Sequence, residues 1–217
     1  MLSAPVLVAV TLAVLVLVGV RSYYEPQLNR DYIVWNLFLA WVPYVCARAL
    51  WRVAHRPRSL LLMLPLVAVW LAFLPNAPYL VTDLVHLHHP GDFRVVLEVA
   101  LFGSVAIAGV LLGVASVQPV HRLAAQRYGR LAAGAFPPVI ALAVAFGVYL
   151  GRVQRWNSWE LFETPGSLLH ATWAVLGHPA DHPRAVGGIA LFTLAFLAAY
   201  LALTTERESF GAPQRHA

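Results

Sequence analysis

The chain has 217 residues, of which 60% are hydrophobic and only 12% are charged, about half the charge that soluble domains carry. The mean hydropathy of +0.69 agrees with this composition, which excludes an ordinary soluble globular protein. The net charge of +5 arises from arginine alone, since lysine is absent, and no basic stretch is both long and solvated. The charge therefore argues for loops near lipid head groups and against nucleic-acid binding.

Six apolar segments are long enough to be membrane-spanning helices, because a helix needs about 20 apolar residues to cross the hydrocarbon core. In chain order they are residues 4–20, 32–50, 60–80, 95–117, 131–150 and 185–204. The first differs from a secretory signal peptide, since it lacks a basic N-terminal region and a clear cleavage site. The sequence predicts one all-α integral membrane domain, residues 1–217, built as a polytopic bundle of about six transmembrane helices.

Two glycine pairs and one cysteine lie inside or at the ends of these segments. Gly109 and Gly113 are four residues apart, as are Gly147 and Gly151. Small residues at this spacing let helix backbones approach closely, and we expect packing within one bundle rather than a dimer face. The single cysteine, Cys46, excludes an intrachain disulfide and is expected to be a buried apolar residue.

The arginine distribution predicts the orientation of the bundle. With six spans, both termini lie on the side of the second and fourth loops. The opposite side holds the smaller share of the arginines, namely Arg21, Arg30, Arg94, Arg152, Arg155 and Arg184. Cytoplasmic loops are enriched in basic residues, so we expect both termini in the cytoplasm of a bacterial cell. The first segment alone would predict the reverse orientation, because Arg21 directly follows it and no arginine precedes it.

Three polar and aromatic segments lie on the side opposite the termini, at residues 21–31, 74–89 and 151–160. Singly, each has a structural explanation, because Trp and Tyr favour membrane interfaces and proline ends helices. Together they predict a binding site, since broken helix ends beside charged residues are where membrane proteins build cavities. The candidate ligand-binding residues are Asn76, Tyr79, Asp83, His86, Arg152, Arg155, Trp156, Asn157, Trp159 and Glu160.

Histidines of the second polar segment offer a second chemistry. Catalytic zinc takes three His or carboxylate ligands and keeps one open position. The candidate ligands are Asp83, His86, His88 and His89, with His170, His178 and His182 of the fifth loop as further members. Their spacing matches no established zinc motif, so no cofactor is predicted and zinc is kept as the alternative.

The fifth loop, residues 152–184, is too long for a tight turn. Its apolar residues recur between polar ones, and they are Trp159, Leu161, Phe162, Leu168, Leu169, Trp173 and Leu176. This pattern favours an amphipathic helix on the membrane interface, or a lid over the bundle, rather than a seventh span.

Three parts of the chain resemble a known family. They are Asn36, Leu39, Ala40, Trp41 and Pro43 of the second segment, the string PNAPYLVTDLVHL from Pro75 to Leu87, and GVYLGR from Gly147 to Arg152 followed by RWNSW from Arg155 to Trp159. In these residues the chain resembles the bacterial and cyanobacterial membrane family called domain of unknown function 1361. Glu160 stands where we expect aspartate, which keeps the charge. The resemblance implies an integral membrane protein and no particular activity.

Three functions agree with these observations. The leading one is a non-enzymatic membrane protein, a transporter or accessory subunit, that binds a lipid head group or small solute, because arginine pairs well with phosphate and carboxylate. The alternative is a membrane hydrolase in which Asp83, His86 and a loop histidine hold zinc. The third is a structural partner without a ligand. The expected partners are membrane lipids and another membrane protein.

Overall fold

A computed structural model describes most of the chain and shows helices as its regular elements. The residues that it describes are 3–24, 31–54, 56, 59–82, 93–152, 154, 163, 166–167, 172–173, 175 and 177–210. The elements are α1 (Ala4–Tyr24), α2 (Asp31–Val53), α3 (Ser59–Phe73), α4 (Asn76–Tyr79), α5 (Phe93–Arg152), the 3₁₀ helix η2 (Pro179–Asp181) and α8 (Pro183–Phe210). These ranges contain no strand, which confirms the all-α prediction for the described part of the chain.

Five helical stretches of the described residues are long and apolar enough to cross a membrane. They are Ala4–Tyr24, Asp31–Val53, Leu60–Thr82, Val95–Arg152 and Pro183–Thr205. The third of them includes both α3 and α4, together with the break between these helices. The stretches contain all six apolar segments of the sequence, with the fourth and fifth segments in one helix.

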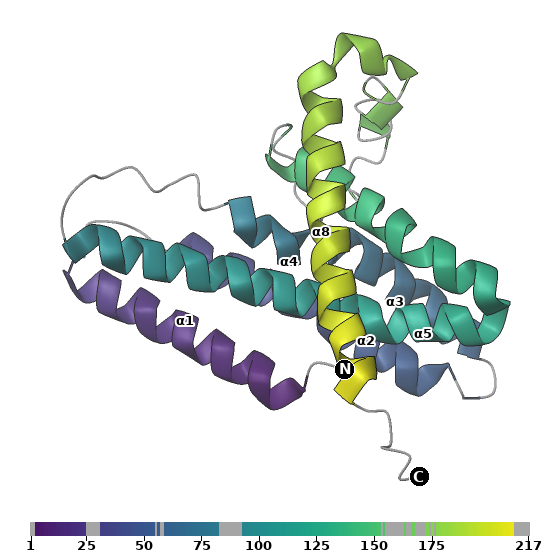
Figure 1. The fold of residues 1–217 in the computed structure, drawn as a ribbon, viewed down its shortest axis with the longest axis horizontal. Helices are drawn as coiled ribbons and strands as arrows, with labels where there is room; N and C mark the ends of the chain where they lie inside the picture. The colour runs from purple at the N-terminus through teal and green to yellow at the C-terminus, as the bar shows by residue number, and fades with distance from the viewer. Residues whose placement is uncertain are drawn as a thin grey trace.

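That helix, α5, is too long for a single crossing. Sixty residues of straight helix would extend about 90 Å, against a hydrocarbon core of about 30 Å. Gly129 interrupts it with φ 79° and ψ −163°, a backbone conformation that the missing Cβ of glycine permits. Figure 1 shows the chain turning back at this bend. We call residues 93–128 the first arm and residues 130–152 the second arm. The count of six spans stays a prediction, because it requires each arm to cross separately.

The first arm also continues beyond the predicted fourth segment. The apolar segment ends at residue 117, but the helix runs through Gln118 and His121 to the bend. His121 bridges the bend through both ring nitrogens. Nε2 lies 2.9 Å from the carbonyl oxygen of Ala133, and Nδ1 lies 2.6 Å from the hydroxyl of Tyr200 in α8. Its ring also stacks on Phe136 at 5.6 Å between centroids. One side chain thus joins both arms to α8.

Two large apolar clusters fill the space between the helices. The first joins α1, α2, α4 and the first arm, with Leu7, Ile33, Leu37 and Leu101 among its most buried members. The second joins α2, α3, both arms and α8 around Trp70, whose indole N–H donates to the Ser116 hydroxyl at 2.7 Å. The helix α8 crosses over α5 in Figure 1. Helices α2 and α5 are therefore the centre on which the others pack.

Candidate functional site

The break between α3 and α4 places backbone groups where a side chain must satisfy them. Proline has no N–H and cannot continue the hydrogen bonds of α3, and the helix ends just before Pro75. The side-chain amide of Asn76 donates to the carbonyl oxygen of Phe73 at 3.2 Å. Three residues after Tyr79, the Thr82 hydroxyl donates to the Tyr79 carbonyl oxygen at 2.6 Å. Polar side chains at the break thus satisfy carbonyls that the helix no longer pairs.

Glycines of both arms pack closely against the segment after the break, from Pro75 to Leu80, which we call the broken segment. A Cβ at Gly109 would lie 2.9 Å from the Cβ of Leu80 and closer still to the carbonyl oxygen of Ala77. On the second arm, a Cβ at Gly147 would lie 2.8 Å from the Cβ of Pro75. The segment from Pro75 to Leu80 therefore lies against both arms, at a distance that only glycine permits. Packing inside the bundle, as predicted, is confirmed at these two glycines.

Arg152 ends the second arm and reaches the same segment. Its Nη1 donates to the Tyr79 hydroxyl at 3.4 Å, and its Nη2 donates to the Thr82 carbonyl oxygen at 3.2 Å. Its guanidinium carbon also lies 5.7 Å from the centroid of the Tyr79 ring, a cation–π distance. The end of the third apolar segment and the end of the fifth therefore meet, as the two polar segments of the sequence predicted.

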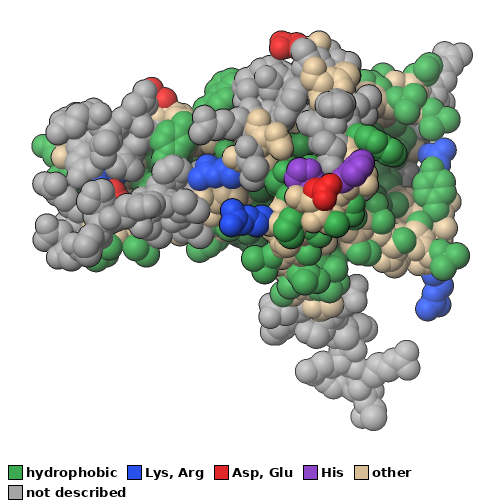
Figure 2. All heavy atoms as spheres, turned by 90° about the horizontal axis from the view of Figure 1, so that it is seen from above, with side chains coloured by type: hydrophobic (Ala, Val, Ile, Leu, Met, Phe, Trp, Pro, Cys, Tyr) green, Lys and Arg blue, Asp and Glu red, His purple; other side chains and the backbone are tan. Residues whose placement is uncertain are grey.

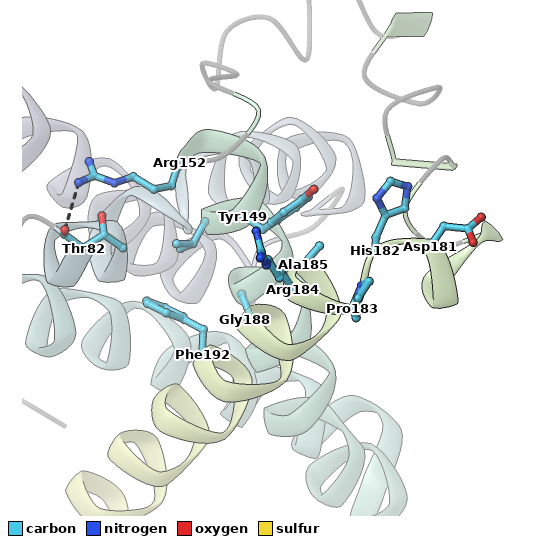
Figure 3. A pocket seen from close by; sticks show the side chains of 12 residues that line it. Thr82, Tyr149, Arg152, Asp181, His182, Pro183, Arg184, Ala185, Gly188 and Phe192 are labelled. Carbon is cyan, nitrogen blue, oxygen red and sulfur yellow. Dashed lines mark hydrogen bonds between the residues drawn. The ribbon is translucent and has the colours of Figure 1, made fainter. Parts of the chain in front are cut away.

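A cavity of about 600 Å³ lies beside this contact. The described residues that line it come from the segment after α4, the second arm, η2 and the start of α8, and they are Thr82, Ala145, Val148, Tyr149, Arg152, Asp181, His182, Pro183, Arg184, Ala185, Gly188 and Phe192. Figure 3 shows Arg152 and Thr82 at one end and Asp181 and His182 at the other, with Tyr149 and Arg184 between them. Most of the wall is apolar, and the polar groups are concentrated in a few side chains.

The charges of this cavity favour an anion. Among the lining residues that the structure describes, Arg152 and Arg184 carry positive charges and Asp181 carries a negative one. Pro183 begins α8, so the positive end of the helix dipole also lies at the cavity. Figure 2 shows basic, acidic and histidine side chains gathered on one face of the molecule. This arrangement suits a phosphate or carboxylate, which arginine binds through paired N–H groups.

The structure describes only three of the ten predicted site residues. Tyr79 and Arg152 touch each other, and only Arg152 lines the cavity, while Asn76 bonds to the backbone of its own break. The residues outside the described ranges are Asp83, His86, Arg155, Trp156, Asn157, Trp159 and Glu160, together with the zinc candidates His88 and His89. The predicted helix or lid in the fifth loop also falls mostly outside them. Within the described ranges, no group of three or more His, Cys, Asp or Glu residues is placed to hold a metal ion.

Sequence reasoning missed the contribution of the residues before and inside the last apolar segment. Asp181, His182 and Arg184 line the cavity, although only the zinc alternative included one of them. A signal for them exists, because polar residues directly before an apolar segment lie at the same level as the end of the preceding span. Arg152 ends the preceding apolar segment and Arg184 directly precedes the last one, and both line the same cavity.

The first polar segment contributes a different contact. Nη2 of Arg21 donates to Oε1 of Glu98 at 2.8 Å, and the side chains are only 3% and 11% exposed. This buried ion pair joins the end of α1 to the start of the first arm. Neither residue lines the cavity described above. Of the three polar segments, two therefore meet at the cavity within the described residues, and the first is joined to Glu98 instead.

Comparison with known proteins identifies the family. The sequence model of the family described as "Protein of unknown function (DUF1361)" matches residues 35–199, which is most of the chain. No curated protein and no solved structure is significantly similar to it. The matched region contains α4, both arms, the cavity and most of α8. The chain therefore belongs to the DUF1361 family, as the resemblance of its sequence indicated.

Proposed function

We propose that the protein is a multi-pass membrane protein that binds an anionic group, carried by a lipid head group or a small solute, between the second arm and α8. The observation that supports this most directly is one mostly apolar cavity that contains both Arg152 and Arg184. Arg184 is exposed and Arg152 is half-buried, so both guanidinium groups keep part of their hydration. Two arginines that line one hollow still attract an anion more strongly than one arginine does, because their positive potentials add.

The surroundings of each arginine support the proposal. Arg152 is oriented by the Thr82 carbonyl and by the Tyr79 hydroxyl and ring, which hold its guanidinium beside Thr82, another residue of the cavity lining. Arg184 lies in the first turn of α8, where unpaired backbone N–H groups also attract anions. A volume of about 600 Å³ suits a small molecule or the head-group end of a lipid.

The binding test uses purified protein in detergent and native mass spectrometry with titrated lipids. We expect phosphatidylglycerol, which is anionic, to bind more tightly than phosphatidylcholine, which is zwitterionic. The preference should be lost in the double variant Arg152→Gln/Arg184→Gln and kept in Arg127→Gln, which removes an exposed arginine next to the bend. Equal lipid preference in all three proteins would contradict the proposal.

We further propose that the chain lies in a bacterial cell membrane with both termini in the cytoplasm, so that the cavity opens away from the cytoplasm. The arginine bias supports this orientation. In a Cys46→Ser background, a membrane-impermeant maleimide should label Gln154→Cys in intact cells and Tyr128→Cys only after lysis. Both positions are exposed; Tyr128 ends the first arm just before the bend, and Gln154 lies just after the other end of the second arm. The reverse labelling would overturn the orientation and change which solutes reach the cavity.

A zinc-dependent hydrolase is the alternative that elemental analysis decides. Its predicted ligands Asp83, His86, His88 and His89 lie outside the described residues, so no distance between them supports it. Protein purified without chelators should contain zinc at one ion per chain if this alternative holds. The anion-binding proposal expects substoichiometric zinc, and it also expects lipid binding that does not respond to chelators.

A further inference from the structure

The walls of the cavity carry more information about the ligand than its two arginines do. Along α8 the lining residues Ala185, Gly188 and Phe192 recur at intervals of three and four, so they lie on one face of the helix. Along the second arm, Ala145 and Val148 recur in the same way and end at Arg152. Seven residues of helix extend about 10 Å, so each helix lines the cavity with an apolar stripe of about that length.

A small hydrated anion gains little from such walls. It would lose water against apolar groups, while only its contacts with arginine would favour binding. A ligand that also carries a hydrocarbon chain would gain from burying that chain against the same stripes, in proportion to the apolar area removed from water. The combination of arginines and long apolar walls therefore fits an amphiphile better than a free solute.

The outer surface of α8 points to the source of that amphiphile. Gly188 and Phe192 line the cavity on one side of α8. Leu191 and Leu194 lie on the neighbouring side of the same helix, and their side chains are 71% and 66% exposed. Apolar surface is therefore continuous from the cavity to the outside of the bundle, where lipid chains would lie if α8 spans a membrane. Gly188 leaves the wall open at this edge, since no atom of the described residues lies within 4 Å of a Cβ built there.

From this geometry we infer that the ligand is an anionic membrane lipid, with its head group at Arg152 and Arg184 and part of its chain in the cavity beside Gly188. The inference rests on the proposed function and adds the chain to it. It assigns Gly188 a role in recognition, because any side chain at this position would occupy the space of the lipid chain.

The test fills the chain site without disturbing the fold. Gly188→Leu places a side chain in the cavity, whereas Gly187→Leu adds the same side chain one residue away, outside the cavity lining. Neither glycine has an atom within 4 Å of its built Cβ, so the two variants should be equally stable. Thermal unfolding of both proteins checks this before binding is compared.

Binding is measured with three anionic probes of one head group: glycerol phosphate, a short-chain lysophosphatidylglycerol and a long-chain lysophosphatidylglycerol. We expect wild type and Gly187→Leu to bind the long-chain probe most tightly. Gly188→Leu should lose about fifteenfold in affinity for that probe, since about two displaced methylene groups are worth about fourfold each. Its affinity for glycerol phosphate should be unchanged.

The possible failures are distinguishable. If all three probes bind equally, or if Gly187→Leu and Gly188→Leu weaken the long-chain probe alike, the inference about the chain is wrong while anion binding stands. If affinity for every probe is the same in Arg152→Gln/Arg184→Gln as in wild type, the proposed function itself is wrong.

Discussion

The contact of Gly109 with the broken segment provides a direct test of the fold. A Cβ at Gly109 would meet the Leu80 Cβ at 2.9 Å and come nearer still to the carbonyl oxygen of Ala77. Leu80 and Ala77 are fully buried, and Pro75 holds the same segment against Gly147 on the second arm. The segment cannot move away from the first arm without disturbing that second contact. We therefore expect Gly109→Ala to destabilise the protein.

Two opposing effects set the magnitude. Alanine is favoured over glycine inside a helix by about 1 kcal/mol. Overpacking a buried contact costs about 1–3 kcal/mol, and the upper part of this range applies because the closest atom is a backbone carbonyl rather than a flexible side-chain end. The net loss for Gly109→Ala should be about 1–2 kcal/mol. Gly103→Ala, on the same arm with nothing within 4 Å of the built Cβ, should gain up to about 1 kcal/mol.

The assay is reversible unfolding in mixed micelles of mild detergent and dodecyl sulfate, followed by tryptophan fluorescence. The quantity compared is the difference in free energy of unfolding between the two alanine variants, expected at about 1–3 kcal/mol from the two estimates combined. Equal stability of Gly109→Ala and Gly103→Ala would refute the close approach of the broken segment to the first arm.

The same unfolding assay checks the bend and the buried ion pair. Gly129→Ala should cost about 1–2 kcal/mol, because a φ of 79° is unfavourable for residues with a Cβ. The control Gly134→Ala should not destabilise the protein, since nothing described lies within 4 Å of its built Cβ. Equal effects of the two substitutions would contradict a strained bend. Glu98→Leu should cost about 3 kcal/mol, because it takes the carboxylate away from the buried Arg21 guanidinium, and Arg21→Met/Glu98→Leu should recover most of that loss. A double variant as unstable as Glu98→Leu alone would show that the pair is not the cause.

Hydropathy predicted where apolar helices lie, but it did not predict where they end. The predicted first segment, 4–20, and last segment, 185–204, fall within Ala4–Tyr24 and Pro183–Thr205. The fourth segment was expected to end at residue 117, and the helix continues to the bend. Hydropathy reports which residues tolerate lipid, whereas the direction of a helix changes where its backbone leaves the helical conformation, as it does at the positive φ of Gly129.

The part of the site that depends only on the alternating direction of successive helices could be predicted from the sequence. Successive spans return to the same side, so Tyr79 and Arg152 were expected at one level, and the structure adds the contact between them. The role of Arg184 was not predictable, because it depends on which helix packs beside the second arm. The pairing of Arg21 with Glu98 was missed for the same reason, since several other charged residues share their side of the bundle.

The break at Pro75 connects the stability of the bundle with the geometry of the cavity. Proline ends α3, and the glycines of both arms let the segment after it approach them closely. This packing fixes the position of Tyr79 and Thr82, the two residues that orient Arg152. Arg152 is thus held in part by the Thr82 carbonyl oxygen, whose position depends on helix packing. A polar site at a helix break can in this way be rigid before any ligand binds, which reduces the ordering cost of binding.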